Sequence, residues 1–224
     1  MRSSYTSEVN CAICHVRKPK RFCPGVRGEI CTVCCGTERE QSVDCPLDCS
    51  YLHEAHLHEK LPDIPEGTVP NTDILVTEEF LRSNEVLMAF LSTAIYEGAL
   101  QAPGITDWDV REGLEALVKT YRSLSSGLYY ENMPVNPFGA AIVTSVQRRL
   151  ADLKKRETEA TGRISTIRDS VVLVVMAFLQ RLEYGHNNGR KRSRAFLDFI
   201  GRFYVPIPGA ETESMEPDEP RIIL

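Results

Sequence analysis

Eight cysteines constrain the fold of this chain most, because all of them lie between Cys11 and Cys49 and none follows. In a small secreted protein such a cluster would indicate a disulfide framework. This chain has 224 residues, and its first ten, MRSSYTSEVN, contain no apolar stretch typical of a secretion signal. The cluster therefore favours metal binding over disulfides, and we expect a cytoplasmic protein.

The spacing of the first two cysteine pairs predicts one tetrahedral metal site. The pairs Cys11-Ala-Ile-Cys14 and Cys31-Thr-Val-Cys34 match the paired-knuckle pattern C-x2-C-x15–20-C-x2-C. Two residues between cysteines allow a tight turn that brings both sulfurs to one ion at about 2.3 Å. We predict that the first site consists of Cys11, Cys14, Cys31 and Cys34.

The other four cysteines predict a second site, made of Cys23, Cys35, Cys45 and Cys49. Cys35 directly follows Cys34, and adjacent side chains point apart, so the two thiolates serve two ions more easily than one. Asp44-Cys45-Pro46 is typical of a helix start, and a helix there would place Cys45, Cys49 and His53 on one face. His53 is therefore an alternative ligand to Cys23.

Zinc suits four thiolates in a closed tetrahedron, and such sites are structural. We therefore predict two Zn²⁺ ions. An iron–sulfur cluster is the alternative cofactor, although the compact cysteine runs common in ferredoxins are absent. Between the two sites, the capping-box pattern from Thr37 to Glu40 predicts the start of a short helix.

The string Cys31-x-x-Cys34-Cys35-Gly36-Thr37-Glu38-Arg39-Glu40, followed by Cys45-Pro46-Leu47-Asp48-Cys49-Ser50-Tyr51-Leu52, resembles a Cys-rich, zinc-finger-like module of uncharacterised bacterial proteins. The resemblance covers about 45 residues. It implies metal binding, and it implies no activity.

The remaining sequence predicts an all-α domain of about five helices. We divide the chain into a Cys-rich two-metal module (1–60), a Pro-containing linker (61–75), the helical domain (76–205) and an acidic Pro-containing tail (206–224). Apolar periodicity and capping residues predict helices over 77–101, from Thr106, from Asn136, over 166–184 and over 191–203. The Val-rich run at 171–175 leaves a buried strand as an alternative there.

The formal net charge of −5 belongs entirely to the residues after position 60, since the first 60 residues are balanced. Such a chain does not coat nucleic acid, but two local basic clusters are candidates for anion binding. The first comprises Arg17, Lys18, Lys20 and Arg21, with Arg27 close by, and it either contacts phosphates or offsets the thiolate charge. The second comprises Arg190, Lys191, Arg192 and Arg194, which the acidic tail could shield.

Enzyme signatures are missing from the sequence: it has no Gly-rich phosphate loop, no G-x-S-x-G and no H-E-x-x-H. We assign no catalytic residue, and we interpret the acidic run Asp107, Asp109, Glu112 and Glu115 as a solvated helix face. The favoured function is a non-enzymatic zinc protein that binds a macromolecular partner, either protein or nucleic acid. The alternatives are a redox or metal-responsive regulator and an enzyme with an unrecognised site in the helical domain. No membrane span and no particular oligomeric state are predicted.

Overall fold

The computed structural model describes residues 10–61, 63–65 and 67–204. Within these ranges the chain forms eight helices and one two-stranded sheet, so the prediction of a mostly helical protein is confirmed. The acidic tail at 206–224, and with it the predicted shielding of the second basic cluster, lies outside the described residues. Among the described helices, none combines the length and apolarity needed to cross a bilayer.

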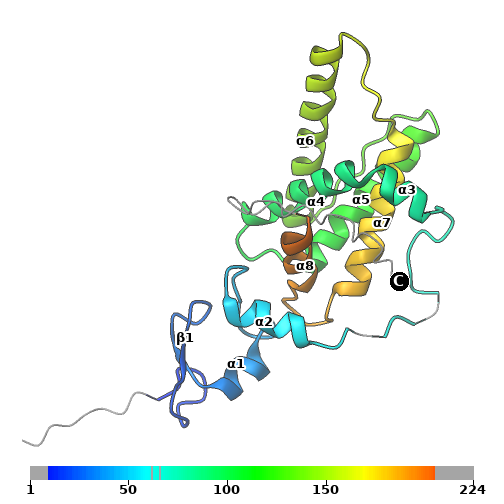
Figure 1. Cartoon of the computed structure of the whole chain (residues 1–224). Helices are drawn as coiled ribbons and strands as arrows, with labels where there is room; N and C mark the ends of the chain where they lie inside the picture. The colour runs from blue at the N-terminus through cyan, green and yellow to red at the C-terminus, as the bar shows by residue number, and fades with distance from the viewer. Residues whose placement is uncertain (1–9, 62, 66, 205–224) are drawn as a thin grey trace, which may run out of the picture.

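The N-terminal module contains a β-hairpin and two short helices. Strands β1 (Arg21–Cys23) and β2 (Gly28–Ile30) pair antiparallel, with Arg21 opposite Ile30. Helix α1 (Thr32–Glu38) follows β2 directly, and α2 (Ser50–His58) ends the module. The module forms the lower part of the molecule in the view of Figure 1.

Two local predictions in this module are wrong. Helix α1 starts at Thr32 and not after Thr37, because the sulfur of Cys31 caps it by accepting from the N–H of Cys34 at 3.4 Å. Helix α2 starts at Ser50 with Cys49 as its N-cap, so Cys45 precedes the helix and shares no helical face with Cys49.

The predicted helix starts of the larger domain are largely confirmed. The domain consists of α3 (Glu78–Ser83), α4 (Glu85–Leu100), α5 (Asp107–Ser125), α6 (Pro137–Thr161), α7 (Asp169–His186) and α8 (Ala195–Phe203). Thr106 and Asp109 form the capping box of α5, and Asn136 caps α6. The predicted helix over 77–101 is two helices, because the backbone leaves helical geometry at Asn84. The Val-rich run lies in α7, which excludes the strand alternative.

Four long helices form the centre of this domain. Helix α5 packs against α7 and α6, and α6 also packs against α4. Leu91, Leu114, Ile142 and Met176, one from each helix, are fully buried in the shared core. The last buried residue of α6 is Leu150, and Figure 1 shows the remaining turns of this helix projecting beyond the other helices.

Asp107 is buried, so the interpretation of the acidic run at the start of α5 as entirely solvated is wrong. Its carboxylate accepts from the N–H groups of Phe196 and Leu197 at 3.0 and 3.1 Å, and from the hydroxyl of Ser193 at 2.6 Å. Asp107 therefore caps the first turn of α8, where free N–H groups would otherwise be buried without partners.

The predicted linker is partly fixed to the helical domain. Ile74 belongs to the helical core, Arg181 of α7 donates to its carbonyl at 2.6 Å, and the amide of Asn71 donates to Gln180 at 2.6 Å. The apolar cores of the module and of the helical domain are nevertheless separate clusters. Leu47 of the module packs against the helical core, and the other contacts that join the two parts are largely polar.

Candidate metal centre

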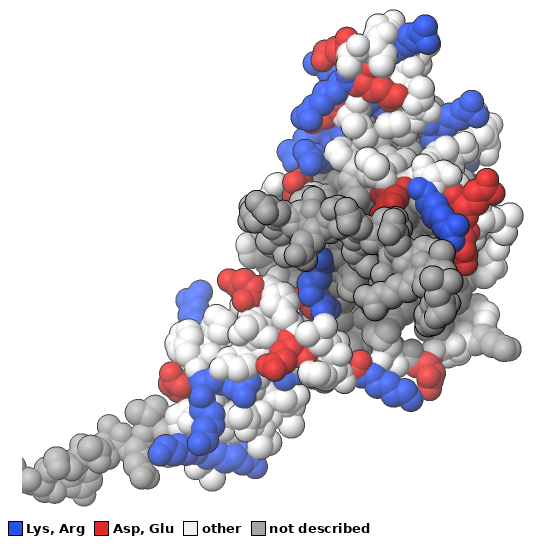
Figure 2. Space-filling view, in the orientation of Figure 1, with Lys and Arg blue, Asp and Glu red and all other residues white. Residues whose placement is uncertain are grey.

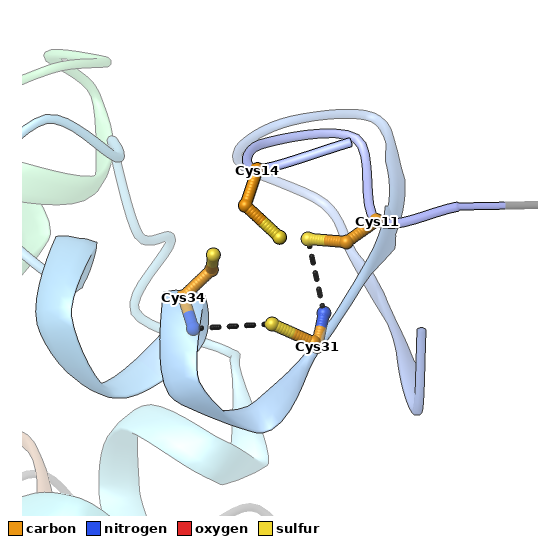
Figure 3. Close-up of side chains that lie close together, drawn as sticks. All are labelled: Cys11, Cys14, Cys31 and Cys34. Carbon is orange, nitrogen blue, oxygen red and sulfur yellow. Dashed lines mark hydrogen bonds between the residues drawn. The ribbon is translucent and has the colours of Figure 1, made fainter. Parts of the chain in front are cut away.

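Four cysteines from two segments of the module lie around one point. Cys11 and Cys14 belong to the loop before the hairpin, whereas Cys31 and Cys34 lie at the start of α1. All four Sγ atoms lie within 4.8 Å of one another, and Figure 3 shows them directed toward a common centre. A zinc ion bound at about 2.3 Å in a tetrahedron would hold its sulfurs about 3.8 Å apart. The prediction that these four residues come together is confirmed.

Backbone hydrogen bonds bring the two segments together. The N–H of Ala12 donates to the carbonyl of Glu29 at 2.8 Å, which places the first knuckle alongside β2. The N–H of His15 donates to the carbonyl of Cys11 at 2.8 Å, and His15 has a φ of 57°, so the chain turns tightly after Cys14. The N–H of Cys31 then donates to the sulfur of Cys11 at 3.3 Å.

The electrostatics of these thiols suit a dication. Burial raises the pKa of Cys11, but hydrogen bonds from the N–H groups of Cys14, Cys31 and Ile13 outweigh burial and lower it to about 6. Burial and the neighbouring Cys31, Cys14 and Cys11 raise the pKa of Cys34 to about 12. One thiolate therefore forms readily, whereas four can coexist in so small a buried space only if a cation compensates them. No cysteine forms a disulfide.

The donor set is thus four sulfurs, three of them buried, with the spacing and closed geometry typical of a structural zinc site. Comparison of the chain with protein-family models, with curated proteins and with solved structures finds no match. The chemistry of the site must therefore be derived from its own residues.

The other four cysteines line one small cavity beside the hairpin, together with Ile30 and Leu52. Its free volume is about 20 Å³, room for little more than one water-sized particle. Burial, and the charges of Glu40, Cys23 and Cys49, raise the pKa of Cys45 to about 11 against the lowering effect of the Glu40 N–H. The sulfurs surround this cavity without the close grouping of the first set. Within the described residues, only the first set meets the 4.8 Å grouping for four thiols.

His53 does not face this cavity, so its prediction as an alternative ligand is wrong. Its Nδ1 contacts the Oδ1 of Asp198, a buried residue of α8. The helix that would have aligned His53 with Cys45 begins only at Ser50, and its His53 contacts α8 of the helical domain. Cys23, by contrast, lines the cavity with Cys35, Cys45 and Cys49.

The second basic cluster meets the chain's own module. Arg190 pairs with Glu59 at 2.9 Å and donates to the carbonyl of Arg39 at 2.8 Å. Arg194 is 5% exposed, pairs with Asp44 at 2.7 Å and donates to the carbonyl of Cys45. Arg192 lies 3.7 Å from Asp44, and Lys191 is exposed. Arg190 and Arg194 therefore form ion pairs that hold the module on the helical domain. This corrects the prediction of an external anion site there.

The first basic cluster divides into two kinds of residue. Arg21 lies over the ring of Tyr51 at 3.9 Å, with its Nη1 3.9 Å from the sulfur of Cys35. Hydrogen bonding to Cys31, and the charges of Cys14 and Cys31, raise the pKa of Arg17. Lys18 and Lys20 are exposed. The structure thus places two of these cations beside thiols and leaves two in solvent.

A buried network that the sequence does not indicate is centred on Glu40, which is fully buried and has a φ of 54°. Its carboxylate accepts from the N–H of Arg194 at 2.6 Å, the amide of Asn188 at 2.7 Å and the Nε2 of His56 at 3.1 Å. The Nδ1 of His56 lies 3.0 Å from the Oδ2 of Asp198. Because these partners are more than 140 residues apart in sequence, apart from the pair Glu40 and His56, no local pattern could reveal them.

His56 is expected to remain protonated well above neutral pH. Burial lowers its pKa, but the hydrogen bonds and charges of Asp198 and Glu40 outweigh burial and raise it from 6.5 to about 9. Since the folded pKa is the higher, the stabilisation from His56 is complete below about pH 6.5 and is lost as pH rises through about 9. An NMR titration of the imidazole should give a midpoint near 9, and Asp198→Asn should lower it. A midpoint at or below 6.5 in the parent protein would contradict this.

Proposed function

We propose that residues 10–60 form a structural zinc module that presents a binding surface to a macromolecule while docked on the helical domain. The observation that carries the proposal is the closed group of Cys11, Cys14, Cys31 and Cys34. A closed tetrahedral site has no open position for a substrate, so its contribution is to folding. A module with so small an apolar core depends on such a contribution.

A second zinc ion is part of the proposal. Its ligands are Cys23, Cys35, Cys45 and Cys49, which line one cavity and would need to approach one another by a small movement when an ion enters. Arg21 beside Cys35 supplies a positive charge near this thiolate set. The carbonyl of Cys45 accepts from Arg194, so an ion held there would also fix the loop segment that contacts the start of α8.

Metal analysis tests both sites. Protein expressed in zinc-supplemented medium is expected to contain two zinc ions per chain and no visible absorption band. Cys11→Ser and Cys49→Ser, which change one set each, should each lower the ratio by about one. A parent ratio near one would overturn the second site, and iron with a visible band would overturn zinc in favour of a cluster.

A redox role is the second candidate, because Cys14, Cys35 and Cys49 are only half-buried and so remain within reach of an oxidant. Zinc-bound thiolates that are oxidised to disulfides release their metal. Treatment with a stoichiometric thiol oxidant would then release zinc, and later reduction in the presence of zinc would restore zinc binding. A structural role predicts slow release and no dependence of partner binding on mild oxidation.

A further inference from the structure

The hairpin end of the module carries cations that form no ion pair within the described residues. Lys18, Lys20 and Arg27 are exposed, and no carboxylate of residues 10–61, 63–65 or 67–204 lies within 4.0 Å of their charged groups. Arg17 and Arg21, by contrast, lie beside thiols. Compensation of thiolate charge therefore accounts for two of the five cations and leaves three unexplained.

The same hairpin carries an exposed aromatic side chain. Phe22 is 58% exposed in the middle of β1, and alternation along an extended strand puts Lys20 on the same side as Phe22. The tight turn between the strands presents Arg27, whose φ is 56°. Lys20 is fixed to β2, because its N–H donates to the carbonyl of Ile30 at 2.8 Å. An exposed ring next to cations on this hairpin offers a flat apolar face on which a base can stack.

The distribution of charge on this end differs from that on the helices. Figure 2 shows Lys and Arg gathered over the lower part of the module, whereas positive and negative side chains alternate along the projecting end of α6. Among residues 10–30 the only acidic side chain is Glu29, which lies opposite Phe22 in the hairpin. The cations near the end of α6 have acidic neighbours, such as Glu159 at 3.8 Å from Lys155.

We propose that this hairpin surface binds single-stranded nucleic acid, with Lys18, Lys20 and Arg27 on phosphates and Phe22 stacked on a base. The inference rests on the proposed function, because the metal-held fold supplies the rigid surface. Cations around an exposed ring are the combination that single strands require, since phosphates and base faces are both accessible. An acidic protein segment would use the cations but would leave the ring without a matching group. In a duplex the base faces are stacked on one another, so Phe22 would have no free base face to contact.

The experiment measures fluorescence anisotropy of the zinc-loaded full chain with single-stranded RNA, single-stranded DNA, a duplex of the same sequence, and polyglutamate. Binding of at least one single strand, tighter than of duplex or polyglutamate, is expected. The stronger of the two strands identifies the natural class. Absence of single-strand binding at low salt, or equal binding of polyglutamate, would overturn the proposal.

Variants assign the binding to the hairpin. Changing Lys18, Lys20 and Arg27 together to Gln should weaken binding at least tenfold and reduce the slope of log K against log salt by about 2. Phe22→Ala should weaken it about tenfold through lost stacking, and Glu29→Gln should strengthen it. The matched control changes Lys155, Arg156 and Arg163, all exposed, to Gln.

All variants must retain the parent zinc content, which separates this proposal from the metal sites. A control that weakens binding as much as the hairpin triple change would show non-specific attraction and overturn the assignment. If the parent protein contains zinc but binds no single strand, the nucleic-acid inference alone is overturned. If the parent protein contains no zinc, the proposed function is overturned.

Discussion

Replacing Cys34 by serine is expected to unfold the N-terminal module and to leave the helical domain folded but less stable. The side chain is 5% exposed and belongs to the closed thiolate group, so its loss removes much of the metal's contribution to folding. Structural zinc contributes on the order of 10 kcal/mol in small zinc-dependent peptides. The module has no comparable source of stability, because its apolar cluster is small.

The helical domain has its own core, which the substitution does not touch. The buried Arg194 loses its partner Asp44, and the buried Asp198 loses His53 and His56 and keeps only Arg202 of α8. Leaving buried charges unpaired is costly, by about 3–5 kcal/mol where a partner is removed outright. We therefore expect a cooperative helical melt at a clearly lower temperature.

Circular dichroism and zinc content together measure this outcome. The variant should lose at least one zinc ion per chain while most helical signal remains at low temperature. Val33→Ser is the matched control, because it introduces the same residue in the same helix at a side chain that is 48% exposed. Complete loss of helical signal in Cys34→Ser would show that the two cores fold only together.

Replacing Glu40 by alanine is expected to separate the unfolding of the two parts. Its carboxylate joins the module to the segment before α8 through Arg194 and Asn188, and it also accepts from His56. Removing it takes this acceptor from three donors, one of which is the buried imidazolium of His56. We expect a loss of about 3–5 kcal/mol in the free energy of unfolding, because removing one member of a buried charge pair is costly.

Two independent probes can follow this separation. Trp108, the single tryptophan, donates through Nε1 to the carbonyl of Arg190 at 2.9 Å, so its fluorescence reports on the helical domain near the interface. A zinc-sensitive dye reports on the module. In the parent protein the two transitions should coincide in denaturant, and in Glu40→Ala zinc release should come first.

Glu54→Ala is the control, because this glutamate lies exposed on α2. It should change the free energy of unfolding by less than about 0.5 kcal/mol. Coincident transitions of unchanged midpoint in Glu40→Ala would show that the buried network contributes nothing to docking.

Short-range sequence patterns determined several features of this protein. The spacing of Cys11, Cys14, Cys31 and Cys34 predicted their meeting, because a two-residue separation restricts each pair to one turn. The starts of α5 and α6 followed from Thr106, Asp109 and Asn136, since capping depends on residues within one turn of each other. The apolar periodicity of the later chain predicted a helical domain with its own core.

The relation between the two parts was decided by tertiary structure alone. No local sequence pattern indicates the partners of the cations at positions 190, 192 and 194, which lie in the module. The same holds for Asp107 and Glu40, whose burial depends on N–H groups supplied by distant segments. A charged side chain is buried only where the folded chain supplies donors to replace water. Local sequence therefore specified the knuckles and the helices, whereas long-range hydrogen bonds and ion pairs determined how the module docks.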